Sequence, residues 1–205
     1  MPNSTISSRR CFLETLAPLG CLAGCGCAQL LAMTQRQGAT ESKPHKFKDP
    51  SNMSYEQVFE FAFAKSFLGI FKVLAAQIGR EKFLPMLQEA SSKVATYQAS
   101  AISRRFPKND LASFVSLFRS DDPFWKHVLT LQTVEETEKV IEVRITECLW
   151  AKTFRGADAA DIGYAAVCFS DYAGASAFNP MMKLIRTKTL MQGHDCCNHR
   201  WIVEA

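Results

Sequence analysis

Cysteine and histidine side chains crowd one short segment near the C-terminus of this 205-residue chain, Gly193–Trp201. His194, Cys196, Cys197 and His199 lie within it, which is two of the chain's four histidines and two of its eight cysteines. Thiols and imidazoles carry out nucleophilic, acid–base and metal chemistry near neutral pH. The segment is therefore the first candidate for a functional site.

The segment is expected to be a strand, and alternation then divides its side chains between two faces. If Cys196–Val203 is extended, Cys197 and His199 share one face and Cys196 lies on the other. The two adjacent cysteines therefore do not both face one pocket. We expect Cys197 and His199 to form one wall of a pocket whose other walls are Cys148 and Asp171.

The bulk properties fit one domain with a sizeable core. The net charge is +4, and the lysines and arginines are not gathered into a stripe. Beyond the N-terminal leader, no apolar run reaches the roughly 18–20 residues that a spanning helix needs. We therefore expect a small-molecule partner and no nucleic acid.

Two arginines near the N-terminus belong to a candidate signal. Ser8–Leu13 precedes a weakly apolar stretch rich in glycine and alanine, Thr15–Met33. This arrangement resembles a bacterial twin-arginine export signal. Leu22–Cys25 resembles a lipoprotein lipobox, which implies acylation of Cys25 and attachment to the membrane. We expect residues 1–33 to be an export signal or membrane anchor, and the domain to lie in the periplasm or on the outer face of the cell membrane.

The leader changes the count of cysteines that belong to the folded body. Four of the eight precede residue 34, which leaves Cys148, Cys168, Cys196 and Cys197. In an oxidising compartment four cysteines can form two disulfides. Disulfide pairing is therefore the main alternative to a chemical role for these thiols.

Helical patterns dominate the first half of the body. Residues 34–53 are polar and carry two prolines, so we interpret them as a linker before a domain at residues 54–205. Apolar spacing predicts a helix from Ser54 to a stop at Gly79 and a second from Glu81 to Arg104. A shorter helix is expected through Phe118, capped by Asn109 or Asp110.

The second half changes to strand-like alternation. We expect strands at Trp125–Thr133, Lys139–Cys148, Met182–Met191 and Cys196–Val203, and a helix at Gly156–Cys168. Helices followed by a β-rich half indicate an α+β fold. The predicted architecture is N-terminal helices packed on a C-terminal antiparallel sheet, with one or two further helices.

An ordered series of short motifs follows residue 146. It comprises Glu147-Cys148, Gly156-Ala157, Ile162-Gly163, Cys168–Tyr172, Phe178–Pro180, Arg186–Gly193 and Cys197–Arg200. This series resembles the L-2-amino-thiazoline-4-carboxylic acid hydrolase family. The similarity covers about Tyr55 to Trp201.

The resemblance implies hydrolysis of a C–N or C–S bond in a small cyclic amidine. The reacting carbon of such a substrate is an isothiourea carbon, which resembles a guanidinium. Its hydrolysis needs a nucleophile, a proton donor for the departing ring sulfur, and a carboxylate for the amidine nitrogens. A cysteine, a histidine and an aspartate meet these needs.

The residues assigned to these roles all follow Glu147. The candidate nucleophiles are Cys148 and Cys197, the candidate acid–base groups are His199 and His194, and Asp171 is the partner of the amidine or of a histidine. Arg186 and Thr187 are the candidate substrate-binding residues, and Arg186 is suited to a substrate carboxylate.

A second hypothesis is a membrane-tethered, non-catalytic binding or sensing domain that holds a metal, haem or small ligand in a Cys/His pocket. Cysteine and histidine suit zinc, whose bound water can act as the nucleophile. The chain has no C-x-x-C pair among the body cysteines, so zinc is weakly indicated and no cofactor is required. Cys168 also fits a small core residue.

Overall fold

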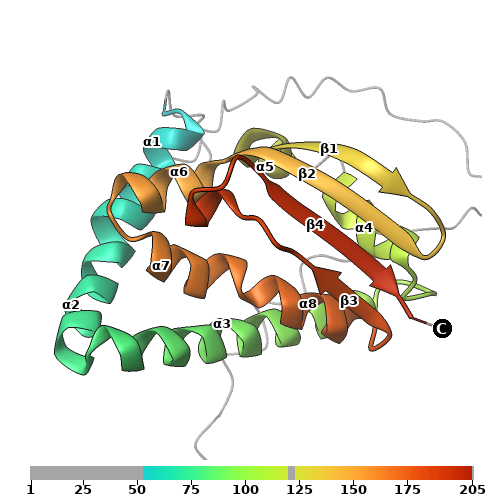
Figure 1. Cartoon of the computed structure of the whole chain (residues 1–205), viewed down its shortest axis with the longest axis horizontal. Helices are drawn as coiled ribbons and strands as arrows, with labels where there is room; N and C mark the ends of the chain where they lie inside the picture. Colours follow the sequence, from blue (N-terminus) through green and yellow to red (C-terminus); the bar gives the residue numbers. More distant parts are fainter. Residues whose placement is uncertain (1–52, 120–122, 205) are drawn as a thin grey trace, which may run out of the picture. The chain divides into compact units, whose positions relative to one another are not determined.

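A four-stranded antiparallel sheet forms the C-terminal half of the domain (Figure 1). Its strands are β1 (Leu129–Glu136), β2 (Val140–Cys148), β3 (Met182–Ile185) and β4 (Cys197–Val203), in the order β1-β2-β4-β3. The structure is a computed structural model that describes residues 53–119 and 123–204. Helices precede the sheet and pack on it, so the predicted α+β class and architecture are confirmed.

Alternation along β2 and β4 separates an apolar face from a wet one. Ile145 pairs with Cys197 and Val143 pairs with His199, and all four side chains are buried. On the opposite face Arg200 donates to the Glu142 carboxylate at 2.7 Å. The predicted division of the last strand, with Cys197 and His199 on the buried face, is confirmed.

The first helical region begins at a capping box. The backbone N–H of Gln57 donates to Ser54 Oγ at 3.2 Å, and the Ser54 N–H donates to Gln57 Oε1 at 2.8 Å. Three continuous segments follow, α1 (Tyr55–Phe59), the π-helix η1 (Glu60–Phe67) and α2 (Leu68–Ile78). Gly79 ends the region at φ 93°, as its position predicts.

Two further helices match their predicted ranges closely. Helix α3 (Arg80–Ser103) is long and packs along α8 (Ser170–Phe178). Helix α4 (Leu111–Arg119) begins where the Ser113 N–H donates to Asp110 Oδ1 at 2.9 Å. Its Phe114 ring lies 5.4 Å from the Trp201 ring, which fixes α4 against the buried face of the sheet.

The strand predicted at Trp125–Thr133 is wrong in its first half. Helix α5 (Pro123–Val128) occupies that part, and β1 starts only at Leu129. Proline is well suited to the first position of a helix. The Phe124 ring also packs 5.7 Å from the Trp150 ring, so tertiary packing outweighs the β propensity of the aromatic residues.

The helix predicted at Gly156–Cys168 is a series of shorter segments. They are α6 (Leu149–Gly156), α7 (Ala160–Gly163), the π-helix η2 (Tyr164–Cys168) and then α8. The backbone of Asp158, at φ 51°, turns the chain between α6 and α7. The thiol of Cys148 caps the start of α6, which the sequence pattern did not predict.

The strand predicted at Met182–Met191 ends early, at Ile185. The backbone N–H groups of Thr187 and Lys188 donate to the side-chain oxygen of Asn198, at 3.0 and 2.6 Å. Because this amide takes those donors, the backbone ladder with β4 stops. A 3-10 turn, η3 (Leu190–Gln192), then leads towards β4.

The described residues contain no helix with the length and apolar character needed to span a bilayer. The predicted signal or anchor at 1–33, the lipidation site Cys25 and the linker at 34–53, apart from its last residue, lie outside the described residues.

Replacing two glycines of the N-terminal helical region by alanine should change the free energy of unfolding in opposite directions. At Gly79 the positive φ strains any side chain and an added Cβ would lie 2.7 Å from Glu81 Oε1, so Gly79→Ala should destabilise the fold by about 1 kcal/mol. At Gly69, inside α2, an added Cβ meets nothing within 4 Å, so Gly69→Ala should stabilise it by about 0.5–1 kcal/mol. Urea unfolding of both variants measures the two changes, and equal signs would contradict this account of the helix break.

Candidate functional site

A cavity of about 590 Å³ lies between the buried face of the sheet and the helices α3, η2 and α8. Most of the side chains that line it are apolar or aromatic. They include Phe71, Leu87, Val94, Val115, Trp125, Leu129, Leu131, Ile141, Val143, Ile145, Trp150, Val167 and Trp201. We call this space the central cavity.

The groups that carry chemistry gather on one part of the wall of the central cavity. They come from separate elements: Cys148 ends β2, Cys168 ends η2, Asp171 lies in the first turn of α8, Arg186 follows β3, and Cys197 and His199 lie on β4. The predicted walls of the pocket, Cys197–His199, Cys148 and Asp171, therefore do enclose one space. Whether these residues are catalytic stays a prediction.

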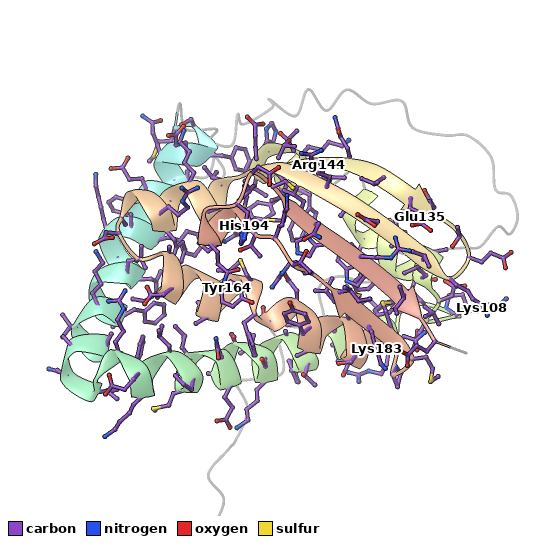
Figure 2. All side chains as sticks on the ribbon, viewed as in Figure 1. Lys108, Glu135, Arg144, Tyr164, Lys183 and His194 are labelled. Carbon is purple, nitrogen blue, oxygen red and sulfur yellow. The ribbon has the colours of Figure 1, made fainter. Side chains whose placement is uncertain are left out.

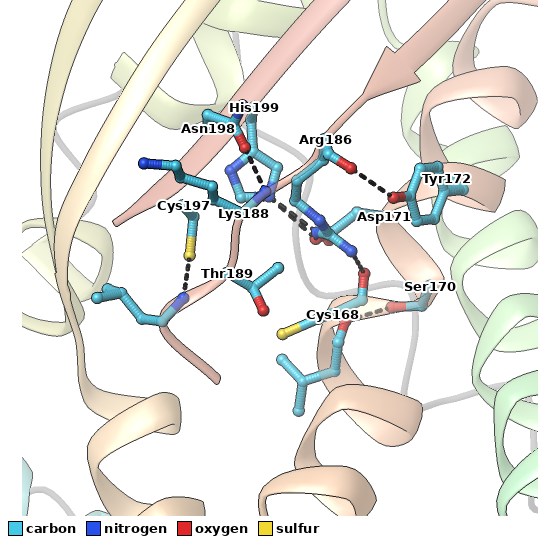
Figure 3. Close-up of polar contacts among 12 residues, drawn as sticks. Cys168, Ser170, Asp171, Tyr172, Arg186, Lys188, Thr189, Cys197, Asn198 and His199 are labelled. Atoms are coloured by element: carbon cyan, nitrogen blue, oxygen red, sulfur yellow. Dashed lines mark hydrogen bonds and ion pairs between the residues drawn. The ribbon is translucent and has the colours of Figure 1, made fainter. Parts of the chain in front are cut away.

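The Arg186 guanidinium is the centre of this polar cluster (Figure 3). Its side chain is 1% exposed, and Nη1 donates to Asp171 Oδ2 at 2.6 Å while Nη2 donates to the Cys168 carbonyl at 2.8 Å. The guanidinium carbon also lies 4.9 Å from the centre of the Tyr172 ring. Burial is the largest single influence and opposes the charged guanidinium, but Asp171, Cys168, Tyr172 and Tyr164 together outweigh it, so the pKa of Arg186 is raised.

The same guanidinium determines the tautomer of His199. Arg186 Nη1 lies 2.9 Å from His199 Nε2, and Asp171 Oδ2 lies 3.4 Å from it. An arginine can only donate, so this bond requires an unprotonated Nε2 and places the ring proton of a neutral imidazole on Nδ1. That Nδ1 is buried and has no hydrogen-bond partner among the described residues. The ring stacks on Trp201 at 5.3 Å, which holds its plane.

The three thiols of the central cavity are neutral at pH 7. Burial raises the pKa of Cys148, raises that of Cys168 strongly, and raises that of Cys197 to about 11. Two backbone hydrogen bonds lower the thiol pKa values but do not cancel the effect of burial. The Ala151 N–H donates to Cys148 Sγ at 3.5 Å, and the Leu190 N–H donates to Cys197 Sγ at 3.2 Å. Any nucleophilic step must therefore include removal of the thiol proton.

The part of the chain that the structure describes contains only free cysteines and no disulfide. Within the same residues, no three histidine, cysteine, aspartate or glutamate side chains are grouped closely enough to hold a metal ion. The donor set of the central cavity therefore offers sulfur, imidazole and carboxylate groups without the convergence that a zinc site requires.

A family comparison decides what the chain is related to. The model of the L-2-amino-thiazoline-4-carboxylic acid hydrolase family matches residues 60–201. The chain belongs to this family. The match includes every residue that lines the central cavity, and it confirms the resemblance carried by the motifs after residue 146.

Comparisons with individual proteins add less to this family assignment. No curated protein matches the chain. Among solved structures, the phenol-responsive sensory domain of the transcription activator PoxR, crystallised with phenol, is similar at 8% identity and a TM-score of 0.48, over 68% of this chain and 74% of that one. Trafficking protein particle complex subunit 3 from Naegleria fowleri, covalently bound to palmitic acid, is similar at 7% identity and a TM-score of 0.43, over 69% of this chain and 95% of that one.

Two predicted site residues of this family member do not line the central cavity. His194 is exposed on the turn before β4 (Figure 2), and its Nδ1 accepts from the Thr189 backbone N–H at 3.2 Å. Thr187 is exposed, and its hydroxyl accepts from Asn198 Nδ2 at 2.9 Å. Neither residue is among those that line the central cavity with Cys148, Asp171 and His199.

Arg186 lies in the cavity wall, but its Nη atoms are already engaged. They contact Asp171, His199 and the Cys168 carbonyl, and the side chain is 1% exposed, so a substrate carboxylate has little access to the guanidinium. Its role in substrate binding stays a prediction.

Two tyrosine rings beside Arg186 were not predicted from the sequence. Tyr172 and Tyr164 face the guanidinium of Arg186, at 4.9 and 5.8 Å. Sequence spacing carries no signal for this stacking because it joins residues from α8, η2 and the segment after β3. The inward direction of Arg186 could have been predicted, since it continues the alternation of the buried Met182 and Leu184.

Replacement of Arg186 should cost far more stability than replacement of an exposed arginine. Arg186→Met leaves Asp171 without its ion pair and the buried Cys168 carbonyl without its donor, so we expect a loss of about 3 kcal/mol. Arg144→Met is the matched control, because Arg144 forms an exposed pair with Asp195 whose loss should cost about 1 kcal/mol or less. Urea unfolding measures both, and similar losses would contradict a central role for Arg186.

The buried thiols predict a loss of stability at alkaline pH. The Cys197 pKa of about 11 exceeds the value of about 8.5 that an unfolded thiol has, so the folded state holds its proton longer. Stability is fully present below about pH 8.5 and falls as pH rises towards 11, by about 3 kcal/mol for this thiol. The test compares the unfolding free energies of Cys197→Ala and the wild type between pH 8 and pH 11. The variant should lose less stability over this range, because it has no Cys197 thiol to ionise.

Cys196→Ala is the control for that experiment. It removes the neighbouring buried thiol, which does not line the central cavity. Identical pH profiles for Cys197→Ala and the wild type would show that Cys197 does not cause the decline.

Proposed function

We propose that this member of the hydrolase family cleaves a C–N or C–S bond of a small cyclic amidine inside the central cavity. One observation carries the proposal. The same cavity is lined by Cys148 from β2, Cys197 and His199 from β4, and Asp171 from α8. Sulfur, carboxylate and imidazole groups around one concave site are the components of nucleophilic catalysis.

Cys148 is the preferred nucleophile, with Cys197 as the alternative. Its Sγ accepts the Ala151 N–H at the start of α6, where backbone dipoles stabilise a developing thiolate. The sulfur attacks the amidine carbon while the thiol proton passes to an amidine nitrogen. The bond from that carbon to the ring sulfur then breaks, and the ring sulfur takes up a proton. Water then displaces the cysteine from the carbon and restores the thiol, so the net change is the addition of one water molecule.

Asp171 and His199 supply the remaining functions. The Asp171 side chain is 43% exposed and uses Oδ2 for Arg186, which leaves Oδ1 to accept from the amidine nitrogens. His199 lines the same cavity, with its Nε2 3.4 Å from Asp171 Oδ2, and its imidazole is the group that we assign to protonate the departing sulfur. Arg186 holds both groups in position.

The place of action is a further part of the proposal. The twin arginine of Ser8–Leu13 and the lipobox cysteine Cys25 support export and attachment to the outer face of the cell membrane. The partner there is a small molecule, and no cofactor is required for the chemistry described above.

The apolar lining of the central cavity favours a second candidate function. A domain that only binds or senses a small ligand needs an enclosed apolar cavity but no reactive thiolate, and burial disfavours the thiolate of Cys148, Cys168 and Cys197. The two candidates differ in one measurable property, since only the hydrolase consumes its ligand.

Alanine substitutions should identify the nucleophile. With L-2-amino-thiazoline-4-carboxylic acid as the substrate and ring opening followed by mass spectrometry, Cys148→Ala should lower kcat by about a thousandfold or more, because the covalent route is lost. If Cys197 is the nucleophile instead, Cys197→Ala should show that loss. Cys196→Ala is the matched control and should keep the wild-type rate. Ring opening at the wild-type rate in both cavity variants would refute the cysteine mechanism.

A further inference from the structure

We infer that the ligand of the central cavity is an amphiphile, with an amidine-type head at Asp171 and an apolar substituent that lies between α3 and the β1–β2 face. This inference deepens the proposed function and rests on it for the nature of the head. It makes a separate claim about the rest of the molecule, namely that the natural substrate is larger and more apolar than the single carboxylated ring after which the family is named.

The size of the cavity is the first argument. Cavities of about 300–1,000 Å³ typically hold drug-sized ligands, and this one measures about 590 Å³. A single five-membered ring with a carboxylate fills a small part of that volume. The remaining space must hold either water or another part of the ligand.

The lining of the remaining space argues against water. Leu129 and Leu131 of β1, Ile141 and Val143 of β2, and Leu87 of α3 form walls that offer no hydrogen bond from a side chain. Water in an apolar cavity lacks the polar partners that hold it, whereas an apolar group gains roughly 25 cal/mol for each Å² that it buries. An apolar substituent is therefore the occupant that these walls stabilise best.

The charges at the polar end are the second, independent argument. Among the described residues that line the central cavity, Asp171 and Arg186 are the only aspartate, glutamate, lysine or arginine residues. They form an ion pair at 2.6 Å, and both Nη atoms of Arg186 are bonded within the protein. Arg186 is 1% exposed, whereas Asp171 is 43% exposed. A carboxylate on the ligand would therefore meet the carboxylate of the pair while the cation stays inaccessible, which is unfavourable.

An amidine head meets no such penalty. Its N–H groups can donate to Asp171 Oδ1, which is not engaged by another described residue. The cluster as it stands therefore selects a neutral or basic head and disfavours an acidic one. This selection follows from the ion pair and does not require Arg186 to release Asp171.

The apolar part of the ligand has a route into the cavity. Val94 on α3 lines the cavity and yet is 55% exposed, and the exposed Gln98 and Thr133 also line it. These residues place an opening between α3 and β1. An apolar substituent can enter there while the head reaches Asp171.

Tryptophan fluorescence can test the inference directly, because all three tryptophans of the chain line the cavity. The probes are 2-amino-thiazoline with an octyl substituent on ring carbon 4 and L-2-amino-thiazoline-4-carboxylic acid. We expect the octyl compound to bind at least about tenfold more tightly, with a negative heat-capacity change in calorimetry. Equal or tighter binding of the carboxylated ring would overturn the inference.

A charge at the opening tests where the substituent lies. Val94→Glu should weaken binding of the octyl compound about tenfold or more, while Val73→Glu should not change it. Val73 is the matched control, because it is a valine on α2 that is 56% exposed and does not line the cavity. Circular dichroism verifies that both variants fold. Equal effects of the two substitutions would show that the octyl group lies elsewhere and would overturn the inference.

Ring opening, followed in the same samples, separates this inference from the proposed function. Tight binding of the octyl compound without ring opening leaves the ligand class intact and rejects the hydrolase. Ring opening of the carboxylated compound, together with weak binding of the octyl compound, supports the hydrolase and rejects the amphiphile.

Discussion

The polar half of the central cavity depends on one buried cation. Arg186 follows a short edge strand, yet its guanidinium reaches the start of α8, the carbonyl that ends η2 and the imidazole on β4. A buried cation is costly unless it is paired and hydrogen-bonded, so the contacts of the two Nη atoms with Asp171, His199 and the Cys168 carbonyl hold the helices and the sheet in one arrangement. The buried Nε has no partner among the described residues. The positions of Asp171 and His199 follow from the requirement for pairing.

The thiols of the cavity are subject to two opposing effects. Burial disfavours their ionised form, and the backbone N–H groups of Ala151 and Leu190 favour it. Burial is the larger effect in the unliganded protein. A ligand with a basic head changes this balance, because a positive charge beside the sulfur stabilises a thiolate in a medium of low dielectric constant. In the proposed function, the reactivity of these thiols would therefore depend on whether a ligand is bound.

The sequence was informative wherever local periodicity decides the structure. The buried face shared by Cys197 and His199, the stop at Gly79 and the cap at Asp110 all follow from rules that act within a few residues. The walls formed by Cys148, Cys197 and His199 were predicted because these residues lie on strands that were expected to pair.

Other features depend on contacts between distant residues, and these were missed. Helix α5 forms because its aromatic side chains pack on residues far away in the chain, against their own β propensity. The strand that starts at Met182 ends at Ile185, and the side chain of Asn198 accepts from the backbone N–H groups of Thr187 and Lys188 beyond it. The hydrogen-bond partners of Arg186 could not be predicted either. Strand alternation gives the direction of a side chain but does not identify the residues that it contacts.

The strand order has a consequence for how the protein is made. The central position between β2 and β3 belongs to β4, which is the last strand in the sequence. Neither neighbour can complete its pairing until that segment has been synthesised, and the wall formed by Cys197 and His199 arrives with it. Because pairings so distant in sequence form slowly, the nascent chain carries an incomplete sheet with unpaired edges until then. The part of the cavity wall that carries Cys197 and His199 is therefore completed only when β4 pairs with β2 and β3.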